Sequence, residues 1–501
     1  MKKSQRMRKK LAYSLGSLFV IYALLLIPEP APVQPPPPPV SRTAGVFAWQ
    51  QDDFWNGLEK QFQEIRRIGC AGAAEDLSKG FTRIRVLLAT LEKKEFNPAD
   101  PVFSLAEQAV FTVAPYVAGC PERFPEFMSI VVRLRDAVKR QSRRWSMDDR
   151  IVRETMYRLM YGSRAALEEV MLQMPEEVVP DLIRGTDEVS STPSAEMLGV
   201  RLHSGDILIS RGGAPTSALI ARGNDFPGNF SHVALVHVDS ATRNISILES
   251  HIERGVTVST TEDYLADTKL RIMVMRLRAD LPAILSDPLI PHTAARLSLT
   301  EALQRHIPYD FAMDYTDPEK LFCSEVASSV YRSAGIRLWT GLSTLSQVGV
   351  RSWLGDFGVR HFETQEPSDL EYDPQLVVVA EWRDPETLYK DHIDNAATEV
   401  MLEGADRGDR LTYDHALLPV VRVVKAYSWV LNVFGGVGPV PEGMSATAAL
   451  KNTMYSERHA EVTQSLSNQA FEFKKSRGYT PPYWQLLAMA RKFTNAKNVS
   501  R

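Results

Sequence analysis

The sequence predicts an α+β fold in which an antiparallel sheet is flanked by helical regions. Two patterns indicate this fold. Apolar residues recur at spacings of three and four between about residues 47 and 180, and the pattern is helical again after about residue 384. Between these regions lie short apolar and β-branched stretches bounded by turn residues, which are typical of strands.

Length and composition restrict the class of protein. The chain has 501 residues and a formal net charge of -3. A chain of this length is expected to form several domains of about 100 to 200 residues. The charge is close to neutral and no nucleic-acid-binding motif is recognisable, so we expect no nucleic-acid partner. The three cysteines include no CxxC pair, and the histidine pattern lacks HExxH, so we expect neither a metal site nor a cofactor.

The first 28 residues have the pattern of a membrane anchor. Residues 2–10 contain six basic residues and no acidic residue, and residues 11–28 are apolar. Eighteen residues rise about 27 Å as a helix, close to the hydrocarbon thickness of a bilayer. Because basic flanks stay in the cytoplasm, we predict a cytoplasmic tail (1–10) and a single-pass inner-membrane anchor (11–28), with the body in the periplasm.

The prolines after the apolar run distinguish this predicted anchor from a cleaved signal peptide. They begin at Pro28 and include the run Pro35–Pro39, whereas a signal peptide has small residues at its cleavage site. We therefore expect an uncleaved anchor, and cleavage followed by secretion is the alternative. Residues 29–45 should form a stiff polyproline II linker.

Residues 46–195 are expected to form a helical domain that contains two of the three cysteines. Its helical pattern breaks at 97–101, and Ser146 has an acidic residue three positions later, as in a capping box. Cys70 and Cys120 lie beside small residues at presumed helix ends. Outside the cytoplasm we expect them to form a disulfide. Two buried free thiols are the alternative.

A domain over residues 196–390 carries the strand patterns. A serine-rich cluster at 190–194 precedes it, and a helix-like segment follows the strands at 293–306. His232 and His237 are five residues apart and should lie on opposite faces of one strand. The strands are expected at 206–210, 231–238, 244–249 and 269–277.

Cys323 lies at what reads as a helix start, in the stretch 321–327. Unpaired N–H groups and the positive end of the helix dipole favour a thiolate there. A nearby histidine would favour it further, and the backbone N–H of Cys323 could stabilise an oxyanion. This placement predicts a thiol nucleophile, with His232 as its base.

The segments resemble the permuted papain-like cysteine hydrolases, the YiiX/YebB-like branch of the NlpC-type amidases. The resemblance spans about residues 205–331, and its pieces occur in the permuted order, with the histidine strand before the cysteine helix. The matching pieces are Gly205-Asp206-Ile207, Thr216 to Ile220, Ser231-His232-Val233, Glu249, Gly255-Val256, Tyr309-Asp310 and Phe322-Cys323-Ser324-Glu325.

The resemblance implies a role for three residues. Cys323 matches the nucleophile, His232 matches the general base that later protonates the leaving group, and Glu249 matches the third, orienting position. His251 stays an alternative for that position, because strict alternation would place it on the same strand face as Glu249. The fold implied is a papain-like catalytic domain in which a small sheet packs on helices.

The C-terminal region, 391–501, is expected to be helical. Residues 417–434 are strongly apolar, but Arg422 and Lys425 interrupt them. These charges favour a buried or surface-lying amphipathic helix over a second membrane span. The helical flanks are expected to shape the substrate groove or to bind an envelope protein.

Together these features predict a membrane-anchored, extracytoplasmic cysteine amidase or peptidase that works through an acyl-enzyme. Its expected substrate is a peptidoglycan-type peptide or a small amidated molecule, and an open polar groove would favour this. A lipid or ester acyl hydrolase, or an acyltransferase, is a second hypothesis that an apolar tunnel would favour. An envelope scaffolding protein with a degenerate hydrolase domain is a third, favoured by a buried Cys323 or one distant from His232.

Overall fold

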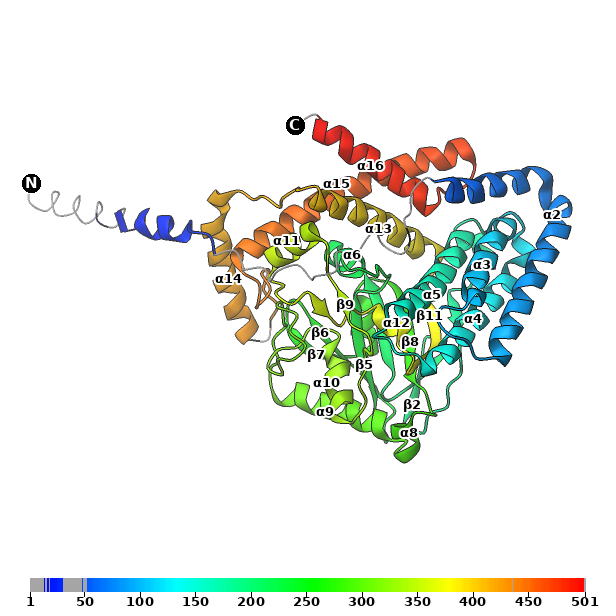
Figure 1. The fold of residues 1–501 in the computed structure, drawn as a ribbon. Coiled ribbons are helices and arrows are strands. Elements are labelled where there is room, and N and C mark those ends of the chain that lie inside the picture. Colours follow the sequence, from blue (N-terminus) through cyan, green and yellow to red (C-terminus); the bar gives the residue numbers. More distant parts are fainter. Residues whose placement is uncertain are drawn as a thin grey trace, which may run out of the picture.

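The computed structural model describes residues 13, 16–17, 19–29, 47, 52–434 and 436–499. The expected basic tail (1–10) lies outside the described residues, as do parts of the anchor (11–28) and all of the linker (29–45) except Glu29. Over the described residues, an antiparallel sheet is flanked by helices before and after it in the chain (Figure 1). The α+β prediction is therefore confirmed.

Long helices form the N-terminal part of the body. Aspartates begin three of them: the side chains of Asp52, Asp100 and Asp149 accept hydrogen bonds from N–H groups of the first turn. The helix expected to start at Ser146 therefore begins three residues later, because Asp149 is the capping residue. The helices are α2 (Asp53–Lys93), α3 (Pro101–Gly119), α4 (Phe124–Gln141) and α5 (Arg150–Met171).

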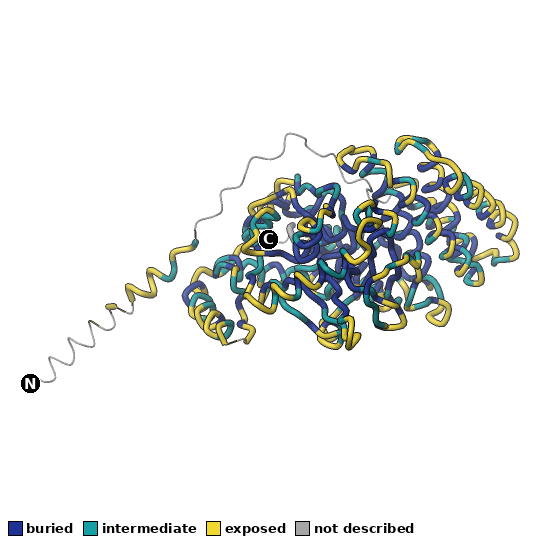
Figure 2. The backbone as a smooth tube through the Cα atoms, turned by 90° about the horizontal axis from the view of Figure 1, so that it is seen from below, coloured by how far each residue is buried: buried dark blue, intermediate teal, exposed yellow. Residues whose placement is uncertain are grey.

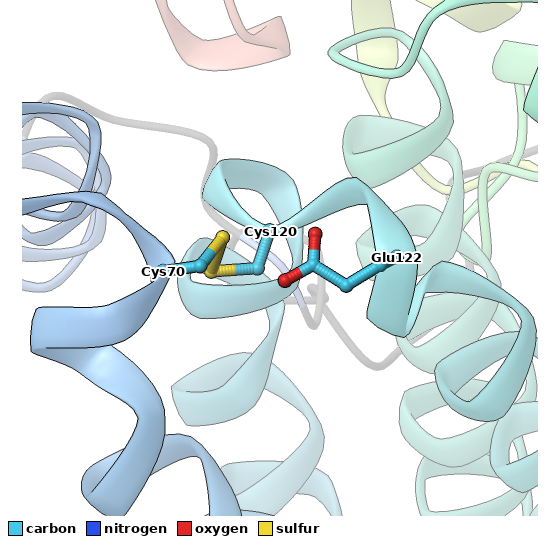
Figure 3. A group of neighbouring side chains, drawn as sticks. All are labelled: Cys70, Cys120 and Glu122. Carbon is cyan, nitrogen blue, oxygen red and sulfur yellow. A yellow bond between two sulfur atoms is a disulfide. The ribbon is translucent and has the colours of Figure 1, made fainter.

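A disulfide joins Cys70 of α2 to Cys120 at the end of α3. The two Cα atoms are 5.4 Å apart, within the usual range for a disulfide. Figure 3 shows the two sulfurs bonded, with Glu122 beside them. Among the described residues, these three side chains form the single group of potential metal ligands close enough to share an ion, and the disulfide already occupies both sulfurs.

Seven strands form the central sheet in the order β1-β11-β8-β4-β5-β6-β7, and every neighbouring pair is antiparallel. The four strands expected from the sequence are the central ones, β4, β5, β6 and β8. The strands are β1 (Leu182–Arg184), β4 (Ile207–Gly212), β5 (His232–Val238), β6 (Ile245–His251), β7 (Gly255–Ser259), β8 (Lys269–Leu277) and β11 (Leu376–Trp382). Two short hairpins complete the strands: β2 (Ser194–Met197) with β3 (Val200–His203), and β9 (Ser343–Thr344) with β10 (Glu363–Thr364).

Side chains on the two faces of the sheet pack into different apolar clusters, because successive residues of a strand point to opposite faces. On one face, Val233 and Leu235 of β5 pack with α9 (Ile290–Gln304) and α10 (Glu325–Ser333). On the other face, Ala234 and Val236 pack with the β2–β3 hairpin. The shorter helices between and after the strands are α6 (Pro215–Arg222), α7 (Thr261–Ala266), α8 (Pro282–Ser286), α11 (Val348–Phe357), which packs on the C-terminal helices, and α12 (Asp369–Tyr372).

Helices of the C-terminal part pack back onto those of the N-terminal part. The rings of Trp55 in α2 and Trp484 in α16 are stacked with centroids 5.3 Å apart, and Glu59 accepts hydrogen bonds from Tyr479 and Trp484. The buried segments gather at the centre of the body (Figure 2). The C-terminal helices are α13 (Pro385–Asp406), which crosses the expected domain boundary at 390, then α14 (Leu418–Val433), α15 (Ala446–Arg477) and α16 (Tyr483–Val499).

Candidate active site

His232 and Glu249 come together through the pairing of two strands. Glu249 of β6 lies opposite Ala234 of β5, two residues from His232, so both side chains leave the same face of the sheet. His232 Nε2 and Glu249 Oε2 are 2.9 Å apart. Because a carboxylate only accepts hydrogen bonds, Nε2 carries the proton, and Nδ1 is left as the basic nitrogen.

The other oxygen of Glu249 has two further partners. Ser259 of β7 donates its hydroxyl to Oε1 at 2.7 Å, and His251 Nε2 lies 3.1 Å from the same atom. Both residues left open for the third position therefore lie at the site: Glu249 contacts His232, and His251 contacts Glu249. Ser259 was not singled out from the sequence, because it carries no motif and reaches Glu249 only through β6–β7 pairing.

The charges of this group follow from burial and hydrogen bonding. Burial alone would raise the pKa of Glu249, but the hydrogen bonds from His232 and His251 hold it well below its usual range. Burial lowers the pKa of His232, although Glu249 opposes this shift. At neutral pH the pair is therefore a carboxylate and a neutral imidazole.

Cys323 lies in the loop before α10 and is held by the elements around it. Leu321 donates its N–H to the carbonyl of Pro308 and accepts the hydroxyl of Ser250 at 2.6 Å. The N–H of Phe322 donates to Glu325 Oε2 at 3.1 Å. These bonds place Cys323 Sγ 3.9 Å from the carbonyl oxygen of Ser231, the residue next to His232.

The thiol differs from the thiolate expected for a cysteine at a helix start. Cys323 is only 4% exposed, and burial raises the pKa of its thiol to about 12. Cys323 lies two residues before the first residue of α10, outside the helix itself. Burial therefore affects the pKa of its thiol more than the helix dipole does. The raised thiol pKa and the lowered imidazole pKa therefore favour a protonated thiol and a neutral imidazole at rest, on two residues that line the same cavity.

Cys323, His232 and Glu249 all line one cavity of about 420 Å³. Most of its other lining residues are polar or charged. Tyr309 also lines it, and burial together with Cys323 raises the pKa of this phenol well above its usual value. The charged lining residues besides Glu249 are Glu253, Arg254, Asp263, Asp267 and Lys269.

Asp310, which belongs to one of the matching pieces, and His237, which follows another, have structural roles rather than catalytic ones. Asp310 is buried and accepts the N–H groups of Ala312 and Asp314, which fixes the turn after Tyr309. His237 stacks on His292 with centroids 5.4 Å apart and does not line the cavity of His232, as expected from their opposite strand faces.

Comparison with known proteins assigns this part of the chain to a family. Residues 201–380 match the family described as permuted papain-like amidase enzymes, YaeF/YiiX, C92 family. This segment is a permuted papain-like amidase domain. The family is one of amidase and peptidase hydrolases, so the enzyme class is assigned to this domain. The match includes β4–β8 and the site residues His232, Glu249, His251 and Cys323, whereas α2–α5 and α13–α16 lie outside it.

A solved structure is similar to part of this chain. The crystal structure of the metalloprotein yiiX from Escherichia coli O157:H7 is 19% identical, with a TM-score of 0.28. The alignment covers 36% of this chain and 97% of that chain. No curated protein matches the sequence of this chain.

Proposed function

We propose that the chain is a membrane-anchored, extracytoplasmic hydrolase that cleaves an amide bond, with Cys323 as nucleophile and His232 as general base. Glu249 is the positioning residue that fixes the imidazole. The observation that carries this proposal is the 2.9 Å contact between His232 Nε2 and Glu249, which leaves Nδ1 as the basic nitrogen of a histidine that lines the same cavity as Cys323.

The steps follow from the protonation states at rest. His232 Nδ1 takes the proton from the Cys323 thiol as Sγ attacks the substrate carbonyl carbon. The tetrahedral intermediate collapses when the imidazolium returns this proton to the amide nitrogen, and an amine leaves. His232 then deprotonates a water, which attacks the thioester and releases the acid and the thiol. Glu249 stabilises the imidazolium that forms in each half-reaction.

The cavity lining supports a polar amide as substrate. Acidic and basic side chains line the cavity, including Asp263 and the pair formed by Asp267 and Lys269. Such a lining suits a peptide that carries both ammonium and carboxylate groups, as peptidoglycan-type peptides do, better than it suits an acyl chain. We therefore favour a peptide or small amidated molecule over a lipid or ester.

The N-terminal helix supports membrane anchoring. Residues 19–25 are helical, and the large side chains of residues 19–22 and of Leu24 are exposed, with Phe19 exposed by 72%. Among the described residues, this helix meets the body through polar contacts of Tyr22 and of carbonyls near its C-terminal end. The exposed apolar side chains before that end are stable in a bilayer but not in water. The basic residues before it support an extracytoplasmic body.

The burial of Cys323 would favour the alternative that the domain is degenerate and inactive. A thiol-directed electrophile distinguishes this alternative from the catalytic proposal. We expect a peptidyl chloromethyl ketone to inactivate the full-length enzyme by alkylating Cys323. Cys323→Ala should abolish hydrolysis of a small peptide amide and leave the circular dichroism unchanged. Cys323→Ser is the matched control for volume. Undiminished hydrolysis by Cys323→Ala would refute the proposal.

A further inference from the structure

Helix α14 exposes an apolar face that no described part of the protein covers. Every exposed residue within α14 is apolar or aromatic, and Phe434 follows directly with 83% exposure. Two described helices are long and apolar enough to cross a membrane. The stretch that forms α3 is 61% buried within the protein, whereas the stretch that ends in α14 is only 17% buried. The exposed residues are Val420, Val423, Ala426, Tyr427, Trp429, Val430 and Val433.

These side chains form a continuous surface. Val420, Val423, Tyr427, Val430 and Phe434 are separated by three, four, three and four residues, so they lie along one face of the helix. The two cations of α14, Arg422 and Lys425, are partly buried, and the side chain of Arg422 is 22% exposed. A face of this kind is typical of a contact with another protein or a membrane.

Arg422 attaches α14 to the end of the N-terminal helix. Its guanidinium donates to the carbonyl oxygens of Leu25 at 3.0 Å and Ile27 at 2.6 Å, and it pairs with Glu29 at 3.4 Å. The last carbonyls of a helix have no partner within it, and a cation is favourable there. A second contact joins the hydroxyl of Tyr22 to the carbonyl of Ala416, just before α14.

The two helices cross rather than lie side by side. In Figure 1 the N-terminal helix, in blue, meets the body at α14, and α14 runs across its direction. The contacts involve the C-terminal end of the N-terminal helix, the end away from the basic tail. If that helix spans the bilayer, α14 therefore lies in the plane of the extracytoplasmic membrane surface.

We infer that α14 is an interfacial membrane helix whose exposed face enters the outer leaflet of the bilayer spanned by the N-terminal helix. This inference rests on the proposed anchoring and names a lipid surface as the partner. Tyr22, Tyr427 and Trp429 fall where aromatic side chains gather at membrane–water boundaries. The exposed side chains carry no charge, and the guanidinium of Arg422 is already paired with Glu29 and with carbonyls of the N-terminal helix, so burial of the face among acyl chains leaves no ion unpaired.

The position of α14 on the membrane also determines how far the catalytic cavity lies from the lipid surface. Val437, three residues after Phe434, lines the cavity that contains Cys323. With α14 on the bilayer, the cavity lies beside the membrane surface, and the enzyme acts on amides held in that layer rather than on ones that diffuse far from it.

Nitroxide labelling of the full chain in phosphatidylethanolamine–phosphatidylglycerol nanodiscs tests this inference. In a Cys323→Ala background, Val423→Cys reports on α14, and Val86→Cys on α2 is the matched control, because the two valines are exposed by 64% and 61%. We expect the ratio of collisions with oxygen, which dissolves in lipid, to collisions with a water-soluble nickel chelate to be several-fold higher at position 423 than at position 86.

Flotation of the same samples with lipid separates the possible failures. If the chain floats but position 423 is as accessible to nickel as position 86, the anchoring stands and the interfacial helix is refuted. If position 423 is inaccessible to both reagents and two labels show dipolar coupling, a second copy covers α14, which also refutes it. A chain that does not float overturns the anchoring and this inference together.

Discussion

At the scale of single residues, Glu249 sets the charge of the candidate site because it accepts hydrogen bonds from His232 and His251. Glu249→Gln keeps the shape of this group but removes the charge that stabilises an imidazolium. We expect kcat on a small peptide amide to fall by about 100-fold, in the range of lost acid–base catalysis. The pKa of His232 should fall as well, which a purely structural role would not cause.

The pH profile of kcat measures both effects in one experiment. Glu262→Gln is the control, because Glu262 is exposed on α7 and does not line the cavity. Its kcat should be unchanged. Wild-type kcat for Glu249→Gln, or an acid limb that stays in place, would contradict the role assigned to Glu249.

The raised pKa of Cys323 predicts an unusual pH dependence for a cysteine hydrolase. The thiol ionises only near pH 12, and His232 becomes protonated only below its ordinary range. Activity should therefore be lost as pH falls below about 6.5, where His232 gains its proton, and stay level through neutral and alkaline pH. Alkylation of Cys323 by iodoacetamide should keep rising toward pH 12, whereas a plateau below pH 7 would indicate a preformed thiolate.

Sequence reasoning found the residues of the site better than their environment. The helix-start pattern and the resemblance carried by the ordered motifs named Cys323, His232 and Glu249, because these signals depend on neighbours in sequence, and strand alternation kept His251 as the alternative to Glu249. The burial of Cys323 depends on the segment around Pro308 and on Ser250, which distant parts of the chain bring to it. Local patterns cannot contain this information, so the sequence pointed to a lowered pKa for the Cys323 thiol, whereas burial in the fold raises it.

At the scale of elements, the Cys70–Cys120 disulfide makes a measurable contribution to stability. It closes a loop with a sequence separation of 50 residues between α2 and α3, which corresponds to about 4 kcal/mol in the chain-entropy model. Cys70→Ser with Cys120→Ser should lower the free energy of unfolding by up to this amount in urea titrations and leave peptide hydrolysis intact. Mass spectrometry that counts three free thiols in non-reduced wild-type protein would contradict the disulfide.

The strands show which elements a sequence can reveal. The four expected strands have long apolar runs, and they occupy the centre of the sheet, where both faces are covered. The outer strands β1 and β7 are short and partly exposed, and β11 acquires its place by pairing with β8, about 100 residues earlier in the chain. Long-range pairing accounts for β1 and β7, whereas β11 also has a β-branched run, Val377 to Val379, that the sequence interpretation overlooked.

At the scale of the whole molecule, buried ion pairs join the helices to the sheet. Glu168 of α5 contacts Arg271 of β8 at 2.6 Å and also pairs with Arg383, and Arg271 contacts Asp391 of α13 at 2.5 Å. Burial alone would raise the pKa of Glu168, but these guanidinium groups hold it far below its usual range. This network connects parts of the chain that lie inside and outside the family match.

Removing one member of this network should leave buried charges without a partner. We expect Glu168→Gln to lower the free energy of unfolding by about 3 to 5 kcal/mol. Glu154→Gln on the same helix is the control, because its exposed pair with Arg150 should contribute less than about 1 kcal/mol. Urea titrations compare the two variants, and equal losses would argue against a structural role for the buried network.

The sheet edge formed by β1 and β11 has a mechanical consequence. The chain enters the sheet through β1 and leaves it through β11, and Leu182 lies directly opposite Trp382 in this antiparallel pair. Tension between the two flanking regions would pull these partners apart at one end of the ladder. The hydrogen bonds would then open one after another, as in a zipper, rather than shear together. The strands that carry His232 and Glu249 lie on the far side of β8 and β4, so the edge would yield before the site is disturbed.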